Sequence, residues 1–260
     1  MVTRMIALLA FLLVSQTGMI NGQTSYENPV ITGMNPDPSI CRVGDNFYLV
    51  TSTFEFFPGI PIYQSKDLVN WKHIGYVLSR VTNCPLSGAY SSGGNFAPAI
   101  NFHNGTFYVT GTNYGGKGSQ EAFYITATNP KGSWSDPVWV GNWNVDPSIM
   151  LANDSKFWVS PDNNGSFMIG TMDPETGKFI KPLKKIATGL GGSSPEGPHM
   201  YKINGYFYLM SAEGGTSYEH REVIQRSRSP WGPFEASPVN LVVSNMNDLQ
   251  NRCATVRRED

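Results

Sequence analysis

Three acidic residues of this 260-residue chain hold similar places in repeated segments, and carboxylates at such places are candidates for acid–base chemistry. Asp37 and Asp146 each begin the tetrapeptide Asp-Pro-Ser-Ile, and Glu196 lies in Pro-Glu-Gly-Pro-His. A pair of aromatic residues begins 10 residues after Asp37 and 11 residues after both Asp146 and Glu196. Each acid thus stands at nearly the same distance in sequence before an aromatic pair. If the three segments fold alike, their carboxylates lie on the same rim of the protein.

Clustered carboxylates suit a hydrolytic acid–base pair. Each negative charge raises the pKa of its neighbours, so the groups titrate apart from one another. A protonated acid beside an ionised base is what cleavage of a glycosidic bond requires. Metal binding is the rival use, but His199 is the one histidine near these turns, and prolines flank the acids. We favour hydrolysis and expect no metal and no cofactor, although a single Asp-Pro turn is more often structural.

A repeated pattern identifies the elements that must position these acids. In four segments a polar turn such as Asn-Gly precedes an aromatic pair and a run in which apolar and polar residues alternate. This pattern is typical of a β-hairpin. A second turn and a further aromatic residue follow each hairpin. Units spaced by 50 to 60 residues predict the blades of a β-propeller, with a sandwich or jelly roll as the alternative. The aromatic pairs are Phe47-Tyr48, Phe107-Tyr108, Phe157-Trp158 and Phe207-Tyr208.

Composition agrees with an all-β protein that binds no polyanion. The chain has 27 glycines and 18 prolines, while only 15% of its residues are charged. Its 19 basic and 20 acidic residues are nearly balanced, so we expect no nucleic-acid or membrane partner. Three cysteines without close spacing (Cys41, Cys84 and Cys253) indicate neither a disulfide framework nor a cysteine metal site.

The N-terminal residues have the layout of a secretory signal peptide. Arg4 precedes an apolar run that is too short to span a bilayer, and small and polar residues follow it. We therefore predict a signal peptide at residues 1–22 and secretion of the protein. Three Asn-X-Ser/Thr tripeptides, at Asn104, Asn153 and Asn164, are compatible with export.

Aromatic residues near the blade starts and ends are candidates for sugar contacts, because the apolar faces of sugars stack on rings. Phe54, Phe56 and Phe57 follow the first predicted hairpin strands, and Phe96 precedes the second hairpin. Core packing is the alternative for any one of them.

Three segments of the chain form a recognisable combination: NPVITGMNPDPSICRVGDNFYLVTSTFEFFPGIPIYQSKDLVNWKHIG, GGNFAPAI and SPEGPHMYKINGYFYLMSAEGGTSYEH. They resemble glycoside hydrolase family 43, within it the β-xylosidases and α-L-arabinofuranosidases. The resemblance covers residues 27–244. It implies a five-bladed β-propeller and hydrolysis by single displacement with inversion.

The resemblance also implies a role for each candidate residue. Asp37 matches the general base that activates water, and Glu196 matches the general acid that protonates the leaving oxygen. Asp146 matches the residue that orients this acid and adjusts its pKa. Phe54 and Phe96 match positions that line the sugar pocket. One departure affects that pocket: Phe96-Ala97-Pro98-Ala99 stands where the family has Trp-Ala-Pro-Asp, and this is expected to alter substrate fit.

The C-terminal residues depart further from the family. The resemblance ends near Ser244, so about four blades are expected, followed by a dissimilar tail at residues 245–260. We expect a missing last blade, from a truncated product or an incorrectly predicted gene end. An arc without that blade would expose apolar surface and strand edges. The chain is therefore expected to fold poorly or to have weak activity.

The function expected from the sequence is that of a secreted glycosidase acting on oligosaccharides from xylan or arabinoxylan. It would cleave β-1,4-xylosidic or α-L-arabinofuranosidic bonds, and no protein partner is inferred. Two alternatives are a sugar-binding propeller without catalysis and a retaining fructan hydrolase, although the chain lacks the Arg-Asp-Pro turn expected of the latter. The sequence does not decide whether the enzyme prefers xylose or arabinose, or whether it cleaves at chain ends or within chains. It also leaves open whether the protein binds a structural calcium ion.

Overall fold

A computed structural model describes residues 25–83, 86, 88–115, 120–141, 145–152, 155–162, 164–173 and 176–244. The predicted signal peptide at 1–22, the predicted tail at 245–260, and Cys84, Cys253 and Asn153 lie outside these residues. Helices long and apolar enough to cross a membrane are absent from the described ranges.

Within the described residues the strands form four antiparallel sheets, each from a consecutive stretch of chain. The first contains β1 (Ser39–Val43), β2 (Asn46–Val50), β3 (Gly59–Ser65) and β4 (Lys72–Leu78). The second contains β5 (Gly94–His103), β6 (Thr106–Tyr114), β7 (Gln120–Ala127) and β8 (Val138–Gly141). The third contains β9 (Ser148–Ala152), β10 (Ser155–Pro161), β11 (Ser166–Thr171) and β12 (Lys184–Thr188). The fourth contains β13 (Glu196–Ile203), β14 (Tyr206–Glu213), β15 (Arg221–Ser227), β16 (Glu235–Ala236) and β17 (Val243–Ser244). A short 3-10 helix, Val81–Asn83, follows the first sheet.

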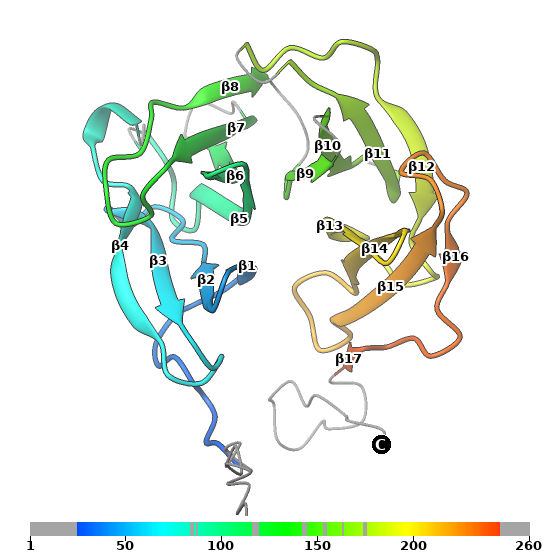
Figure 1. Ribbon diagram of the computed structural model, residues 1–260, viewed down its shortest axis with the longest axis horizontal. Coiled ribbons are helices and arrows are strands. Elements are labelled where there is room, and N and C mark those ends of the chain that lie inside the picture. The colour runs from blue at the N-terminus through cyan, green and yellow to red at the C-terminus, as the bar shows by residue number, and fades with distance from the viewer. Residues whose placement is uncertain are drawn as a thin grey trace, which may run out of the picture.

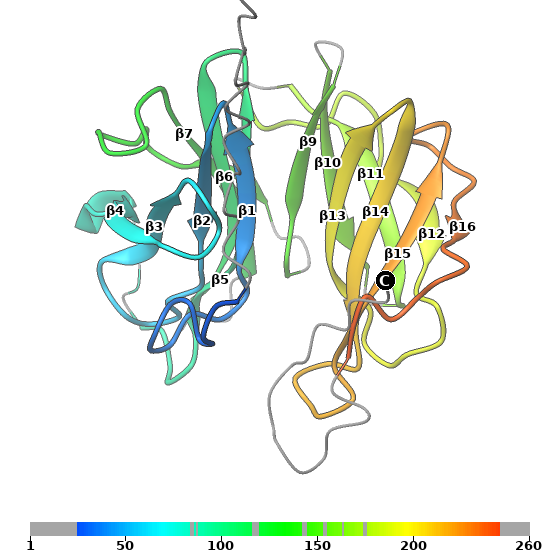
Figure 2. The same cartoon turned by 60° about the horizontal axis from the view of Figure 1, so that its bottom comes forward.

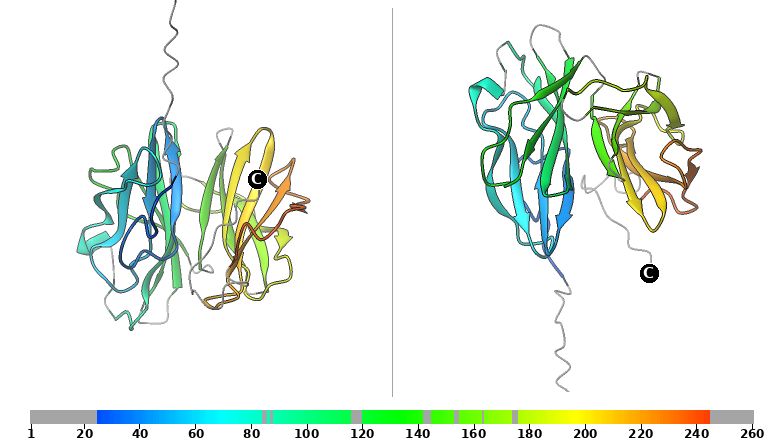
Figure 3. Two further views of the ribbon diagram at one scale, coloured as in Figure 1. Left: turned by 90° about the horizontal axis from the view of Figure 1, so that it is seen from below. Right: turned by 45° about the horizontal axis from the view of Figure 1, so that its top comes forward.

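The four sheets stand around a central axis as the blades of a β-propeller (Figures 1 and 2). The first strand of each blade is the innermost one, so that β1 contacts β5, β5 contacts β9, and β9 contacts β13. Figure 3 shows the first blade, in blue and cyan, and the fourth, in yellow and orange, on opposite sides of this axis. The predicted all-β propeller with four units is confirmed.

Tight Asn-Gly turns connect the first two strands of the second and fourth blades. Asn104 and Gly105 have φ values of 46° and 79°, and Asn204 and Gly205 have 49° and 78°. Two successive left-handed residues fit the twist of a two-residue hairpin, and Asn and Gly adopt this conformation most readily. The hairpins predicted from these dipeptides are therefore present.

The repeated aromatic pairs connect neighbouring blades. Adjacent residues of a strand point to opposite faces of its sheet, so each pair contributes to two different cores. Phe107 packs edge-on against Tyr48 of the first blade, with ring centroids 4.9 Å apart. Tyr108, the next residue, belongs to the core shared with Trp158 of the third blade. Phe157 in turn shares a core with Phe207 of the fourth blade. The pairs recur because each blade must bury both of its faces.

Candidate active site

The three predicted acids lie where innermost strands begin. Asp37 precedes β1 by two residues, Asp146 precedes β9 by two residues, and Glu196 is the first residue of β13. Asp37 and Asp146 share a left-handed backbone, with φ values of 53° and 61°. Such a conformation is uncommon for residues other than Gly, although Asp tolerates it, and it occurs preferentially at functional sites. The repeated tetrapeptide therefore encodes the same turn in two blades.

All three acids line one cavity of about 300 Å³, which we call the acid cavity. They reach it from the first, third and fourth blades. The structure thus brings together the three residues that the sequence offsets grouped. Further residues that line the acid cavity include His199, His220 and Glu222.

Ser52 holds the carboxylate of Asp37. Its hydroxyl donates a hydrogen bond of 2.5 Å to Asp37 Oδ2 and accepts one of 2.7 Å from the backbone N–H of Ala97. Ser52 is buried, and Ala97 belongs to β5 of the second blade. The second blade therefore fixes the Ser52 hydroxyl, and this hydroxyl orients Asp37. This orientation is what a base that must align a water molecule needs.

Asp146 contacts the backbone next to Glu196. The N–H of Gly197 donates to Asp146 Oδ2 at 3.2 Å. Burial, followed by the charges of Glu196 and Asp37, raises the pKa of Asp146 to about 7, while the Gly197 hydrogen bond opposes this shift. Burial also raises the pKa of Glu196; Asp37 adds to this rise and His220 opposes it. The cluster therefore retains protons that isolated carboxyl groups would lose, as a general acid must.

Replacement of Asp146 by Asn is expected to lower the pKa of Glu196. The amide oxygen can still accept from Gly197. Asp146 and Glu196 repel each other when both are ionised and so titrate as a coupled pair, and removal of one carboxyl group lets the other ionise at a lower pH. An acid with a lower pKa loses its proton at a lower pH, so the alkaline limb of the kcat/KM profile should move to lower pH. A pH–rate profile measures this shift. An alkaline limb that stays in place or moves upward contradicts the electrostatic coupling.

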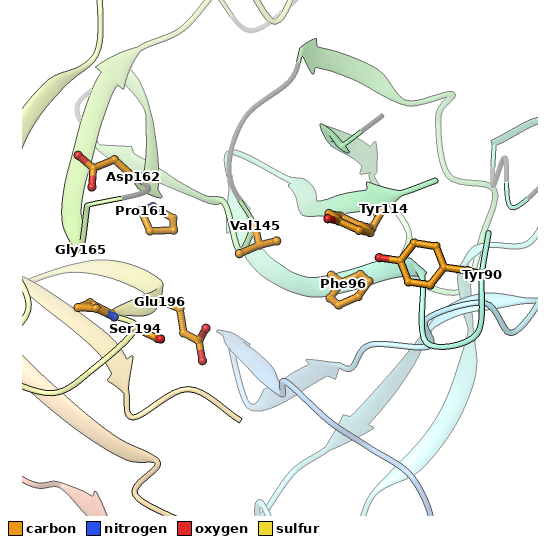
Figure 4. Close-up of a pocket in the computed structure, with 10 residues that line it drawn as sticks. Tyr90, Phe96, Tyr114, Val145, Pro161, Asp162, Gly165, Ser194 and Glu196 are labelled. Atoms are coloured by element: carbon orange, nitrogen blue, oxygen red, sulfur yellow. The ribbon is translucent and has the colours of Figure 1, made fainter. Parts of the chain in front are cut away.

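The two predicted aromatic contacts lie against each other. The rings of Phe54 and Phe96 are edge-on, with centroids 5.0 Å apart. Paired backbone hydrogen bonds, of 3.0 and 2.9 Å, join Phe54 to Asn95. Phe96 and Glu196 line a second cavity, of about 500 Å³ (Figure 4), whereas Phe54 lines neither this cavity nor the acid cavity and contacts Phe96 from outside. A register shift between Phe96 and Ala99 turns the intervening residues toward the acid cavity.

Several residues of the acid cavity have no counterpart in the repeats. Burial lowers the pKa of His199 to about 4, so this side chain is neutral at physiological pH. Burial raises the pKa of Glu222 to about 7. Sequence reasoning considered His199 only as a metal ligand and did not identify Ser52, His220 or Glu222. His220 and Glu222 have no equivalent at the same offset in another blade. The equivalent of Ser52 is Thr112, which does not line the acid cavity, so the repeats do not mark any of the three as a site residue.

A buried ion pair fixes the segment that precedes Glu196. Glu213 is fully buried, and its carboxylate accepts hydrogen bonds from the N–H groups of Leu190 and of Gly192, the latter at 2.8 Å. Arg221 Nη2 lies 2.8 Å from the same carboxylate. Burial opposes ionisation of Glu213, but these donors outweigh it and hold the pKa of Glu213 below its usual range. Glu213 thus ties residues 190–192 to the end of β14, next to Glu196.

No group of three His, Cys, Asp or Glu residues in the described ranges is arranged to hold a metal ion.

Comparisons with known proteins agree on one family. Residues 26–255 match the family described as "Glycosyl hydrolases family 43". The "Non-reducing end alpha-L-arabinofuranosidase BoGH43B" of Bacteroides ovatus is 70% identical over 226 residues, which are 86% of this chain and 43% of that protein. A "Xylosidase/arabinosidase" of Butyrivibrio fibrisolvens is 41% identical over 235 residues, which are 85% of this chain and 45% of that protein.

Solved structures show the same relationship. The structure described as "Bacteroides ovatus Xyloglucan PUL GH43B" is 70% identical and superposes with a TM-score of 0.82 over 86% of this chain and 44% of that one. A xylan β-1,4-xylosidase from Bacillus halodurans C-125 is 36% identical, with a TM-score of 0.79 over 86% of this chain and 45% of that one. The chain thus spans less than half the length of these relatives.

Proposed function

Because the chain belongs to glycoside hydrolase family 43, we propose that it carries the acid–base centre of a glycosidase that releases terminal α-L-arabinofuranosyl residues. One observation carries this proposal: Asp37, Asp146 and Glu196, from three blades, line a single cavity. A module that only binds sugar has no need of such a cluster, whose mutual repulsion makes ionisation costly.

The geometry supports a separate task for each acid. Asp37, held by Ser52, accepts the proton of a water molecule whose oxygen attacks the anomeric carbon. Glu196 gives its proton to the leaving oxygen as the glycosidic bond breaks. Asp146 holds Gly197, the residue next to Glu196, and the repulsion between the Asp146 and Glu196 carboxylates disfavours ionisation of the pair. One water is consumed, and the released sugar has inverted configuration at its anomeric carbon.

The relatives favour arabinofuranosides over xylosides. The protein that is 70% identical is described as a non-reducing-end α-L-arabinofuranosidase, whereas relatives described as β-xylosidases are 27–39% identical. The description of its structure mentions xyloglucan, so oligosaccharides from xyloglucan are the proposed substrates and those from xylan the alternative. The apolar N-terminal segment supports a further proposal, that the protein is exported.

A pair of chromogenic substrates tests the sugar preference. The aryl α-L-arabinofuranoside and the aryl β-D-xyloside carry the same leaving group, so that only the glycosyl part differs. The value of kcat/KM is expected to be at least about tenfold higher for the arabinofuranoside, a difference that contacts to one sugar ring can supply. A preference for the xyloside refutes the assignment. Binding of both sugars without turnover supports the non-catalytic alternative.

A further inference from the structure

The carboxyl groups of the acid cavity have one neighbour that can balance their charge. Glu196 shares this cavity with Asp37 and Asp146, which come from two other blades. Among the described residues that line the cavity, the basic side chains are His199 and His220. Burial keeps His199 neutral, because it lowers the pKa of that ring to about 4. His220 is exposed, so in the described part of the cavity it is the side chain that can carry a positive charge.

The other charged groups near His220 do not replace it. Tyr201 and Glu222 also line the acid cavity, but a phenol and a carboxyl group are either neutral or negative. Arg221, the next residue in the chain, is bound in a buried ion pair and does not line this cavity. Glu219, on the other side of His220, does not line it either. His220 is thus the counter-charge that the described residues offer to the three acids.

A tight loop fixes the ring of His220. The loop joins β14 to β15 and begins at Gly214, which has a φ of 96°. A side chain at Gly214 would collide with the backbone of Glu219, so glycine lets the two ends of the loop approach each other. Nδ1 of His220 lies 2.8 Å from the carbonyl oxygen of Gly215. Because a carbonyl oxygen only accepts, Nδ1 carries a hydrogen, and Nε2 is the nitrogen at which the ring gains its charge.

The same loop contacts the segment that leads to Glu196. The N–H of Gly214 donates to the carbonyl oxygen of Ser193 at 2.6 Å, three residues before the acid. Gly215 packs against the side chain of Ser194. These contacts hold the ring and the carboxyl group near each other, so that their charges interact. Burial raises the pKa of Glu196, and the charge of His220 opposes this rise.

We propose that His220 is a positioning residue for the acid, and that its positive charge stabilises the carboxylate left when Glu196 has given up its proton. The proposal rests on the proposed function, because it takes Glu196 as the acid. An acid that holds its proton too firmly is a poor donor. A cation beside it stabilises the negative charge that develops in the transition state. His220 acts in this way through Glu196 and not on the substrate.

Two replacements of His220 that differ in charge test the proposal. His220→Gln removes the charge, so the pKa of Glu196 should rise and the alkaline limb of the kcat/KM profile should move to higher pH. His220→Lys keeps a charge throughout this range, so its limb should lie at or below that of the native chain. We expect the two limbs to lie about one pH unit apart. This is the low end of the shift that an opposite charge causes, because water screens an exposed side chain.

His73→Gln is the matched control, because His73 is also exposed and lines neither cavity. Its alkaline limb should coincide with that of the native chain. A merely structural role of His220 would lower the rate in both of its variants without separating their limbs. Coincident limbs in His220→Gln and His220→Lys therefore overturn the proposal, as does a limb of His220→Gln that moves to lower pH.

A titration without turnover separates this proposal from the proposed function. If the chain hydrolyses neither arabinofuranosides nor xylosides, the proposed function fails. Carbon-13 NMR of carboxyl-labelled glutamate still follows the ionisation of Glu196, whose signal is assigned by its loss in Glu196→Gln. A midpoint about one pH unit higher in His220→Gln than in His220→Lys then supports the coupling between the two side chains. Equal midpoints overturn it.

Discussion

Replacement of Asp37 by Asn is expected to lower kcat by about 10²–10⁴-fold on every substrate, whatever its leaving group. The base acts on the attacking water, and a water is needed in each turnover. Replacement of Glu196 by Gln should have an effect of the same size on an oligosaccharide but a much smaller one on a glycosyl fluoride. Fluoride leaves as a stable anion and depends less on protonation. The contrast between the two variants therefore separates the base from the acid.

Initial rates for both variants on both substrates measure this contrast. Asp45→Asn and Glu27→Gln are matched controls, since both residues are exposed and neither lines the acid cavity. A Glu196→Gln variant that loses activity equally on both substrates contradicts the assigned role of the acid. Full activity of Asp37→Asn contradicts the role of the base.

Replacement of Glu213 by Ala is expected to lower the free energy of unfolding by about 3–5 kcal/mol. The variant leaves the charge of Arg221 and the N–H groups of Leu190 and Gly192 without the carboxylate that now binds them. These groups are buried or half-buried donors, and a donor that is shielded from water and has no acceptor lowers the free energy of unfolding. The segment before Glu196 loses its anchor as well, so turnover should fall with stability.

Urea unfolding measures this loss, and Glu235→Ala provides the comparison. Glu235 pairs with Arg226 at 2.8 Å, as Glu213 pairs with Arg221, but its side chain is 65% exposed. An exposed pair contributes about 0–1 kcal/mol, because water screens both charges. Similar losses in the two variants would show that the buried pair has no special role.

The pH dependence of the Glu213 contribution follows from its lowered pKa. A carboxyl group whose pKa is lower in the folded state stabilises the fold above the usual pKa of glutamate. That contribution is lost as the pH falls through the pKa of the folded state. The difference in unfolding free energy between the native chain and Glu213→Gln should therefore shrink on acidification.

Much of the fold follows from short patterns. The Asn-Gly turns could be predicted because few other residues adopt two successive left-handed conformations. Pairs such as Phe107-Tyr108 marked the blades because each blade buries both faces. The three acids were found for the same reason, since Asp37, Asp146 and Glu196 hold one place in a repeat.

Features that join different blades could not be predicted in this way. Glu213 accepts hydrogen bonds from Leu190 and Gly192 only when β14 packs against the loop that precedes β13. No periodic pattern in the sequence indicates this contact. The cavity of about 500 Å³ is lined by Tyr90, Asp162 and Glu196, which come from different parts of the chain and share no motif. Sequence repeats report what the blades have in common, whereas substrate contacts depend on how blades differ.

The configuration of the first sugar released from an α-L-arabinofuranoside tests the central claim most directly. Proton NMR at early times distinguishes the anomers before they equilibrate in water. A base at Asp37 that delivers water opposite the acid Glu196 predicts that the β-anomer appears first. Initial release of the α-anomer would contradict the account, because it requires a covalent intermediate on one of the carboxylates rather than a base that activates water.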